Sequence, residues 1–320
     1  MTTIRARAWE LFDDIVESAP SRELSSWRAY EQQIFTVDPD YDTLRQLLAV
    51  PARLGATSQS GVPALALDVW IASELRRAGF NPDQVWPRPS PPRVLSQDIT
   101  GFISSLPARL RKEANDHLAS RGGSGRASAN ILGKHYVKQV DVVMSSWATG
   151  PELMISTKRM DSSFGKNAAN RIEESYGDAK NLRSRHPQAA LGFLYCLGAS
   201  ALDDEPETAR WLIDLLGKLG READAYDAVG LVIQETSSTL PDPTSEIDPA
   251  GPLEPGAVPD LTADSPDVTV HHHPRVTLHR GAVPGELDPG RFLSSMCNLV
   301  LDRTPINFHP EARARRRSAQ

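Results

Sequence analysis

One segment of the chain, QAALGFLYCLGAS at 188–200, is almost continuously apolar. Such a run, set off by Pro187, is typical of a strand that other elements cover on both faces. The shorter segment AVGLVIQE at 228–235 is apolar in the same way and predicts a neighbouring strand. We therefore expect a central sheet rather than an all-helical fold.

The segments around this run add strands and helices in a definite order. The valine-rich, alternating segment 136–147 and the segment 152–160 flank the turn ATGP, which predicts a hairpin. Apolar residues at helical spacing predict helices at 167–185 and 207–219. The resulting order of strand, strand, helix, strand, helix and strand predicts an α/β or α+β fold with a mixed sheet.

The rest of the chain divides by composition. Residues 1–98 show helical patterning that ends in a proline-dense connector, and residues 99–235 form the expected α/β core. Proline, aspartate, serine and threonine dominate residues 236–267, which we expect to be a linker. Residues 268–320 are predicted to be a C-terminal extension with a strand pair, a last helix and a disordered basic tail at 313–317.

The composition of the 320-residue chain is that of an ordinary globular protein, with 40% apolar and 24% charged residues. The sequence has no apolar stretch near the roughly 18 residues that a membrane helix needs. Its first residues carry charges where a signal peptide requires apolar side chains. Cys196 and Cys297 both lie among apolar residues and are expected to be reduced. We therefore expect a cytoplasmic protein with no membrane partner.

The net charge of −6 conceals an uneven distribution of charged residues. Residues 109–185 contain 14 Lys and Arg against eight Asp and Glu, whereas acidic residues dominate 203–267. A basic middle suits a polyanionic partner such as nucleic acid, although a solvated basic helix face would have the same composition.

Two charged residues fall where the predicted hairpin should be apolar. Asp141 lies in VKQVDVVM and Lys158 lies in LMISTKRM, so the hairpin brings them side by side. Burying two charges costs on the order of several kcal/mol per ion unless they pair or bind something. The strand period of two places Ser156 and Lys158 on one face and Thr157 on the other.

This arrangement resembles the PD-(D/E)XK nuclease superfamily, which includes most type II restriction endonucleases. In that family an aspartate on one strand and an acid-x-lysine triplet on the next hold Mg²⁺ and orient a water against the phosphodiester. Asp141 matches the first acid and Lys158 the lysine, but Ser156 stands where the family has an acid. Some members that cut CCGG-containing sites have the same S-x-K, and the following helix supplies their missing carboxylate.

The following helix of this chain offers two candidates for that carboxylate, Glu173 and Glu174. At about 100° per residue, Glu173 falls on the flank of the expected apolar stripe and Glu174 falls opposite it, in solvent. We therefore predict Glu173 as the relocated metal ligand. The expected stripe consists of Ala169, Ile172, Tyr176 and Ala179.

The resemblance implies further site residues. Family members often carry one more glutamate on an upstream helix, for which Glu74 is preferred because its helix is apolar enough to pack on the core, with Glu113 as the competitor. In the resembled enzymes the region after the lysine reaches base edges, and arginine is the usual reader of guanine. The corresponding DNA-binding candidates, for which a solvated surface is the alternative, are Arg159, Lys166, Asn170 and Arg171.

The resemblance implies a restriction-endonuclease-like mixed central sheet flanked by helices, and a Mg²⁺-dependent, site-specific endonuclease acting on double-stranded DNA. Asp141 and Glu173 would hold the metal, Lys158 would orient the water, and Ser156 would be a bystander or bind a metal-bound water. Cutting both strands takes two active sites, which implies a homodimer or a higher homo-oligomer. The alternative is a non-catalytic DNA-binding or assembly protein on the same core, with Asp141 and Lys158 as an ordinary ion pair.

Overall fold

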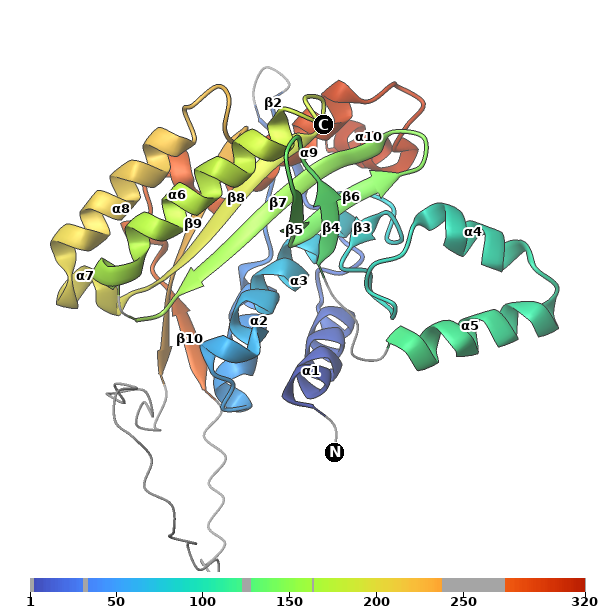
Figure 1. The fold of residues 1–320 in the computed structure, drawn as a ribbon, viewed down its shortest axis with the longest axis horizontal. Coiled ribbons are helices and arrows are strands. Elements are labelled where there is room, and N and C mark those ends of the chain that lie inside the picture. Colours follow the sequence, from blue (N-terminus) through green and yellow to red (C-terminus); the bar gives the residue numbers. More distant parts are fainter. Residues whose placement is uncertain (1–2, 31–33, 123–127, 163, 238–273, 320) are drawn as a thin grey trace, which may run out of the picture.

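A computed structural model describes residues 3–30, 34–122, 128–162, 164–237 and 274–319, without the side chains of 119–122, 166 and 167. Most of the predicted linker and the first half of the predicted strand pair lie outside these residues. The centre of the fold is a six-stranded sheet in the order β10-β9-β8-β7-β6-β3 (Figure 1). Its strands are β3 (Val85–Trp86), β6 (Val142–Ser146), β7 (Gly150–Met160), β8 (Ala190–Gly198), β9 (Ala228–Ser237) and β10 (Arg275–Leu278).

The sheet is mixed, as the sequence predicts. Strands β7, β8 and β9 run parallel, while β6 pairs with β7 and β10 pairs with β9 in antiparallel fashion. Parallel neighbours need a crossover, which α6 (Phe164–Arg183) supplies between β7 and β8. Helices α7 (Ser200–Asp204) and α8 (Pro206–Leu219) supply the crossover between β8 and β9. The predicted α/β class with a mixed, helix-flanked sheet is confirmed.

Strand β8 is buried along its whole length, which confirms the prediction made from its apolar run. Its alternate side chains enter two hydrophobic clusters: Phe193 and Tyr195 pack on the α6 and α8 side, and Leu194 and Cys196 pack on the other side. The other side is covered by α1 (Ile4–Ser18), α2 (Tyr41–Arg53), α3 (Val62–Arg77) and α9 (Pro289–Arg303).

The N-terminal and C-terminal parts share this second cluster with the sheet. Residues of α1 to α3, of β6 to β9 and of α9 pack together in it, so the predicted boundaries at 98 and 235 do not separate hydrophobic cores. The expected disordered tail is wrong, because residues 313–317 lie in α10 (Pro310–Ser318). Arg313 is buried there, and its Nη2 donates to the carbonyl oxygens of Leu301 and Thr304 at 2.7 and 2.9 Å.

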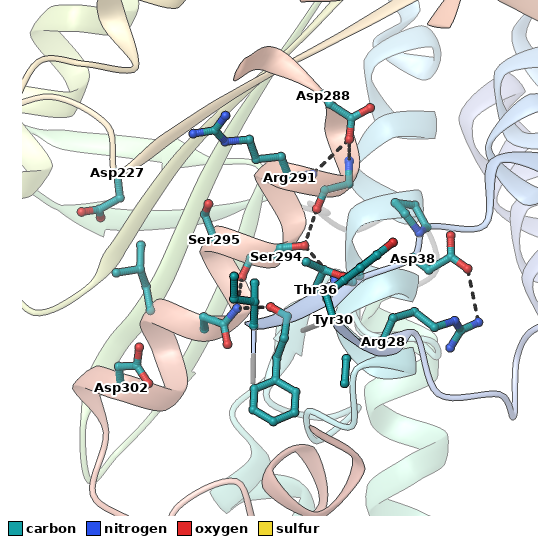
Figure 2. A pocket seen from close by; sticks show the side chains of 18 of the residues that line it. Arg28, Tyr30, Thr36, Asp38, Asp227, Asp288, Arg291, Ser294, Ser295 and Asp302 are labelled. Atoms are coloured by element: carbon teal, nitrogen blue, oxygen red, sulfur yellow. Dashed lines mark hydrogen bonds and ion pairs between the residues drawn. The ribbon is translucent and has the colours of Figure 1, made fainter. Parts of the chain in front are cut away.

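The N-terminal part contains a short hairpin that the helical patterning does not predict. Strand β1 (Trp27–Tyr30) pairs with β2 (Ile34–Val37), and Val37 N donates to Ser294 Oγ of α9 at 2.7 Å. The hairpin and α9 line a cavity of about 1090 Å³, which Figure 2 shows from close by.

Two other predicted elements are each divided. The helix expected over 99–120 is two helices, α4 (Gln97–Ser105) and α5 (Ala108–Gly122), because Leu106 before Pro107 is extended. These helices project from the body in Figure 1. The strand expected over 136–147 is divided at Asp141 into β6 and β5 (Val137–Val140), and β5 pairs with β4 (Ala129–Leu132) in a separate sheet.

The predicted hairpin of β6 and β7 is confirmed, with Val142 opposite Ile155. None of the helices in the part of the chain that the structure describes combines the length and the apolar character of a membrane-spanning segment.

Candidate functional site

Asp141 lies at the junction of β5 and β6, where the chain enters the central sheet. Its Oδ2 accepts a hydrogen bond from the backbone N–H of Thr157 on β7 at 2.9 Å. Asp141 is therefore fixed beside Lys158, the next residue of β7, whose positive charge favours the ionised form of the Asp141 carboxyl. Asp141 thus lies beside the β7 segment that carries Lys158, but it precedes β6 rather than lying within a strand, and the Lys158 ammonium pairs with Glu174 of α6.

A second acid, Asp68, reaches the same point from α3. Its Oδ1 accepts a hydrogen bond from the Thr157 hydroxyl at 2.6 Å, and its side chain is buried. Thr157 therefore holds two carboxylates, one through its backbone and one through its side chain. The sequence analysis missed Asp68, although this lone acid in the apolar stretch LALDVWIA carries the same signal that identifies Asp141.

The two carboxyl groups oppose each other's ionisation. Burial raises the pKa of Asp68 well above its ordinary value, and the charge of Asp141 raises it further. Burial also raises the pKa of Asp141, against the opposing effects of the Thr157 N–H, Lys158 and Lys138. The pair thus holds more negative charge than its surroundings offset, which a bound cation or a retained proton would relieve.

Lys158 points to the other face of β7, toward α6. Its Nζ lies 3.8 Å from Oε2 of Glu174, and its side chain keeps 24% of its exposure. Glu174 Oε1 also lies 3.5 Å from Lys138 Nζ, and Lys138 pairs in addition with Asp178. Burial raises the pKa of Glu174, but the charges of Lys158 and Lys138 outweigh it and hold the pKa below its ordinary value.

Ser156 lies on the same face of β7 as Lys158, as the strand period predicts. Its side chain is buried, and the nearby Tyr226 hydroxyl donates to the carbonyl oxygen of Ser175 of α6 at 2.9 Å. The predicted contact of Ser156 with a metal-bound water is not tested.

The predicted orientation of Glu173 and Glu174 is wrong. Glu173 is exposed and has no ion pair or hydrogen bond with the described residues, whereas Glu174 faces Lys158. The cause is the position of the buried stripe, since Ala169 and Tyr176 are exposed. The buried stripe of α6 includes instead Ala168, Ile172, Ser175, Ala179 and Leu182. Whether Glu173 binds a metal stays an untested prediction.

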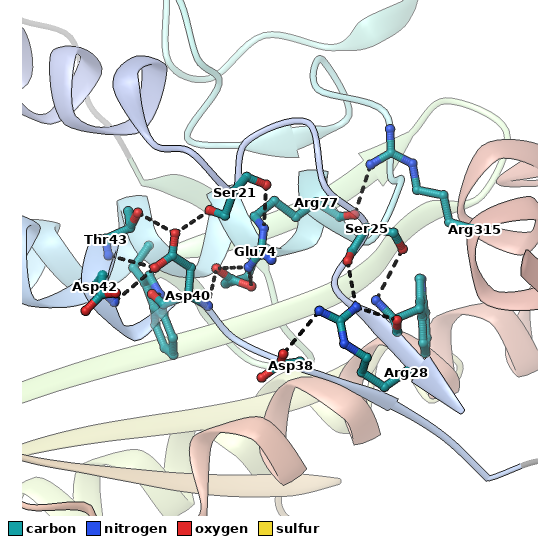
Figure 3. A network of polar contacts seen from close by, with 12 residues as sticks. Ser21, Ser25, Arg28, Asp38, Asp40, Asp42, Thr43, Glu74, Arg77 and Arg315 are labelled. Atoms are coloured by element: carbon teal, nitrogen blue, oxygen red, sulfur yellow. Dashed lines mark hydrogen bonds and ion pairs between the residues drawn. The ribbon is translucent and has the colours of Figure 1, made fainter. Parts of the chain in front are cut away.

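Glu74 belongs to a different cluster, which Figure 3 shows. Both its carboxylate oxygens accept from Arg77 Nη1, at 2.8 and 2.7 Å, and Oε1 also accepts from Asp40 N at 3.1 Å. Burial raises the pKa of Glu74 to about 7, and Arg77 opposes this rise. The competitor Glu113 lies on the exposed helix α5, 3.5 Å from Arg109. The structure therefore brings neither glutamate to Asp141, and Asp68 occupies the place that Glu74 was expected to take.

The predicted DNA-binding residues fall into three groups. The Arg159 side chain is only 7% exposed, and its Nε donates to Asp161 at 2.8 Å, so it is not placed to read bases. Asn170 and Arg171 are exposed on α6, with Arg171 Nη1 4.0 Å from Glu174 Oε2. The Lys166 side chain lies outside the described residues.

The described residues contain no group of three or more His, Cys, Asp and Glu side chains arranged to hold a metal ion. They do offer the carboxylate pair of Asp68 and Asp141, fixed by Thr157. Mg²⁺ in phosphate-processing sites is commonly bound by one or two carboxylates, with waters and substrate oxygens completing its shell. The donor set therefore fits Mg²⁺, although it is smaller than the expected one.

The cavity beside α9 does not include Asp141 or Lys158 among its lining residues. The candidate site is therefore the junction of α3, β6, β7 and α6 around Thr157. Comparison with known proteins adds nothing to this assignment, since no family model, no curated protein and no solved structure matches the chain.

Proposed function

We propose that the protein is a Mg²⁺-dependent endonuclease that hydrolyses phosphodiester bonds in double-stranded DNA, in the manner of the PD-(D/E)XK nucleases. One observation carries the proposal: two acids, Asp141 just before β6 and the buried Asp68 of α3, converge on Thr157, the residue before Lys158 in β7. An ordinary ion pair of Asp141 with Lys158 would have no use for Asp68, a second buried acid whose ionised form is disfavoured by burial and by Asp141.

Asp68 and Asp141 would hold the metal ion. When bound, Mg²⁺ polarises the scissile phosphate and lowers the pKa of a coordinated water. Thr157 would orient both ligands, because its N–H binds Asp141 and its hydroxyl binds Asp68. Replacing groups that hold metal ligands in this way typically weakens metal binding by about 10- to 100-fold.

Lys158 would act on the attacking water and on the charge that develops on the phosphorane. Its partial exposure leaves the ammonium accessible to DNA, and Glu174 holds it on the α6 side of β7. Glu174 is therefore a positioning residue in this proposal. Ser156 would take no part in the chemistry, because its side chain is buried.

The DNA would lie across the exposed side of α6, where Asn170 and Arg171 are available. The α4–α5 arm would add backbone contacts, because Arg111 and Lys112 of α5 are exposed. Cleavage of both strands would take two copies of the site, as in a homodimer.

The test is incubation of the purified protein with unmethylated phage DNA, with Mg²⁺ or with a chelator. We expect discrete fragments that require Mg²⁺ and that disappear in Asp141→Ala and Lys158→Ala. Asp214→Asn is the matched control, because it removes an exposed acid of α8 and should cut normally. Intact DNA that shifts on a gel would favour the non-catalytic DNA-binding alternative, and intact DNA without a shift would contradict both.

A further inference from the structure

A cavity of about 230 Å³ lies between α1, the second half of α3 and the proline-rich segment that follows α3. It includes neither Asp68 nor Asp141, so it is separate from the proposed nuclease site. Apolar side chains form part of its wall, and a set of arginines forms much of the rest. The arginines are Arg22, Arg76, Arg77, Arg88, Arg93 and Arg315.

Five of these six arginines have a carboxylate partner. Arg93 Nη2 lies 2.6 Å from Asp13 Oδ2, and Arg88 Nη2 lies 2.7 Å from Asp83 Oδ1. The other three pairs are Arg22 with Glu23, Arg77 with Glu74, and Arg315 with Glu311; Figure 3 places Arg77 and Arg315 near each other.

Arg76 alone among the six has no carboxylate partner within the described residues. Its Nη2 donates to the carbonyl oxygens of Val85, at 3.4 Å, and of Pro87. Its Nε is buried without a hydrogen-bond partner in the described part of the chain, and its Nη1 donates to none of the described residues. A buried donor without a partner is destabilising, and more so when it is charged.

Other positive charges lie close to Arg76. Burial lowers the pKa of Arg76 to about 9, and the neighbouring charges of Arg93 and Arg88 lower it further, against smaller effects of Asp13 and Asp83. The remaining acid on the cavity wall, Glu17, is exposed, so solvent screens its charge. An anion beside Arg76 would supply the missing acceptor and offset this surplus.

We propose that this cavity binds a small oxyanion, the carboxylate or phosphate group of a small molecule, through the free donors of Arg76. Guanidinium groups bind both head groups through charge-assisted N–H donors. Ser73 would add a hydroxyl, and Trp9, Val16 and Val69 would contact an apolar part of the ligand. The proposal does not depend on the nuclease activity.

The test is isothermal titration calorimetry with inorganic phosphate and with acetate at constant ionic strength. We expect saturable binding of at least one anion, weakened about tenfold in Arg76→Lys, which keeps the charge but loses the fork of donors. Arg210→Lys is the control, because Arg210 is an exposed arginine of α8 and should bind as the unmodified protein does.

The two titrations also distinguish the head group, because phosphate alone indicates a phosphorylated ligand and acetate alone a carboxylate. Thermal unfolding of Arg76→Lys without ligand would establish that the variant is folded. Absence of saturable binding to either anion, or binding that Arg76→Lys leaves unchanged, would overturn the proposal.

Discussion

Two buried acids of α3 have opposite surroundings. Glu74 shares its carboxylate with Arg77 and with the backbone of Asp40, so a positive charge lies against it. Asp68, on the same helix, shares Thr157 with the carboxylate of Asp141. Burial raises the pKa of both acids, but Arg77 opposes the rise at Glu74 whereas Asp141 adds to it at Asp68.

This difference separates a structural acid from a candidate functional one. The Glu74 cluster ties α3 to Ser21 and to the start of α2, because Arg77 Nε donates to Ser21 O at 3.1 Å and Asp40 is the N-cap of α2. The Asp68 cluster ties α3 to β7 but leaves a charge imbalance that folding alone does not require. Perturbed carboxyl pairs of this kind concentrate at functional sites.

The largest expected effect comes from breaking the compensated cluster. Arg77→Met should lower the free energy of unfolding by about 3–5 kcal/mol, because it leaves Glu74 buried without its partner. Urea denaturation at pH 7 measures this loss. Arg45→Met is the control: Arg45 pairs with Asp42 on the surface of α2, and its loss should cost less than about 0.5 kcal/mol. Equal effects of the two substitutions would show that the Glu74 cluster is not what holds α3 in place.

The pH dependence of stability tests the burial of Glu74. Its pKa is about 7 in the folded protein against an ordinary value of 4.5, so between these pH values the folded protein holds a proton that the unfolded chain releases. Stability should therefore fall as pH rises from 4.5 to 7, by on the order of 3 kcal/mol from this group. Relative to the unmodified protein, Glu74→Gln should gain stability over this range. Parallel stability curves for the two proteins would contradict the raised pKa.

Asp68→Asn should have the opposite effect from Arg77→Met. Replacing a carboxyl group whose ionised form is disfavoured by burial and by Asp141 should raise the free energy of unfolding at pH 7 by about 1–2 kcal/mol. DNA cleavage should fall roughly a hundredfold or more. Urea denaturation and the phage-DNA assay measure the two effects on one preparation. Asp214→Asn, an exposed acid on α8, serves as the control and should change neither quantity. A destabilised Asp68→Asn protein would place Asp68 with Glu74 as a structural acid.

The smallest expected effect concerns α6. Glu174→Gln should lower kcat for DNA cleavage several-fold with little change in KM, because Glu174 positions Lys158 rather than touching DNA, and Glu174→Asp should restore part of the loss. Glu173→Gln should change neither constant, because Glu173 is exposed and forms no hydrogen bond or ion pair with the described residues. The reverse pattern, with Glu173 essential and Glu174 dispensable, would restore the original prediction for Glu173.

The strands and crossover helices could be predicted because their apolar spacing is unambiguous. The run at 188–200 has apolar side chains at successive positions, and only a strand covered on both faces uses all of them. The prediction of which face of α6 is buried failed because residues 168 and 169 are both alanine. Starting the apolar stripe at one rather than the other rotates it by about 100° around the helix. Tertiary contact with β7 decides that choice, and sequence spacing does not contain it.

Asp68 is a site residue that could not be assigned from the sequence. Its helix contains two acids in an apolar background, and nothing in their spacing states which one faces β7 and which one faces Arg77. The family resemblance gave only the class of residue and the kind of element that carries it. The short strands β1 and β2 were not predicted, because four residues are too few to establish the alternation of apolar and polar side chains that marks a strand.

The most direct measurement is a titration of the protein with Mn²⁺, followed by electron paramagnetic resonance of the free ion, since Mn²⁺ takes the same oxygen ligands as Mg²⁺. We expect the unmodified protein to bind Mn²⁺. The affinity should fall at least tenfold in Asp68→Asn and in Asp141→Asn, but not in Glu74→Gln. Absence of binding, or binding that survives both aspartate substitutions, would contradict the claim that the carboxylate pair at Thr157 is a metal site.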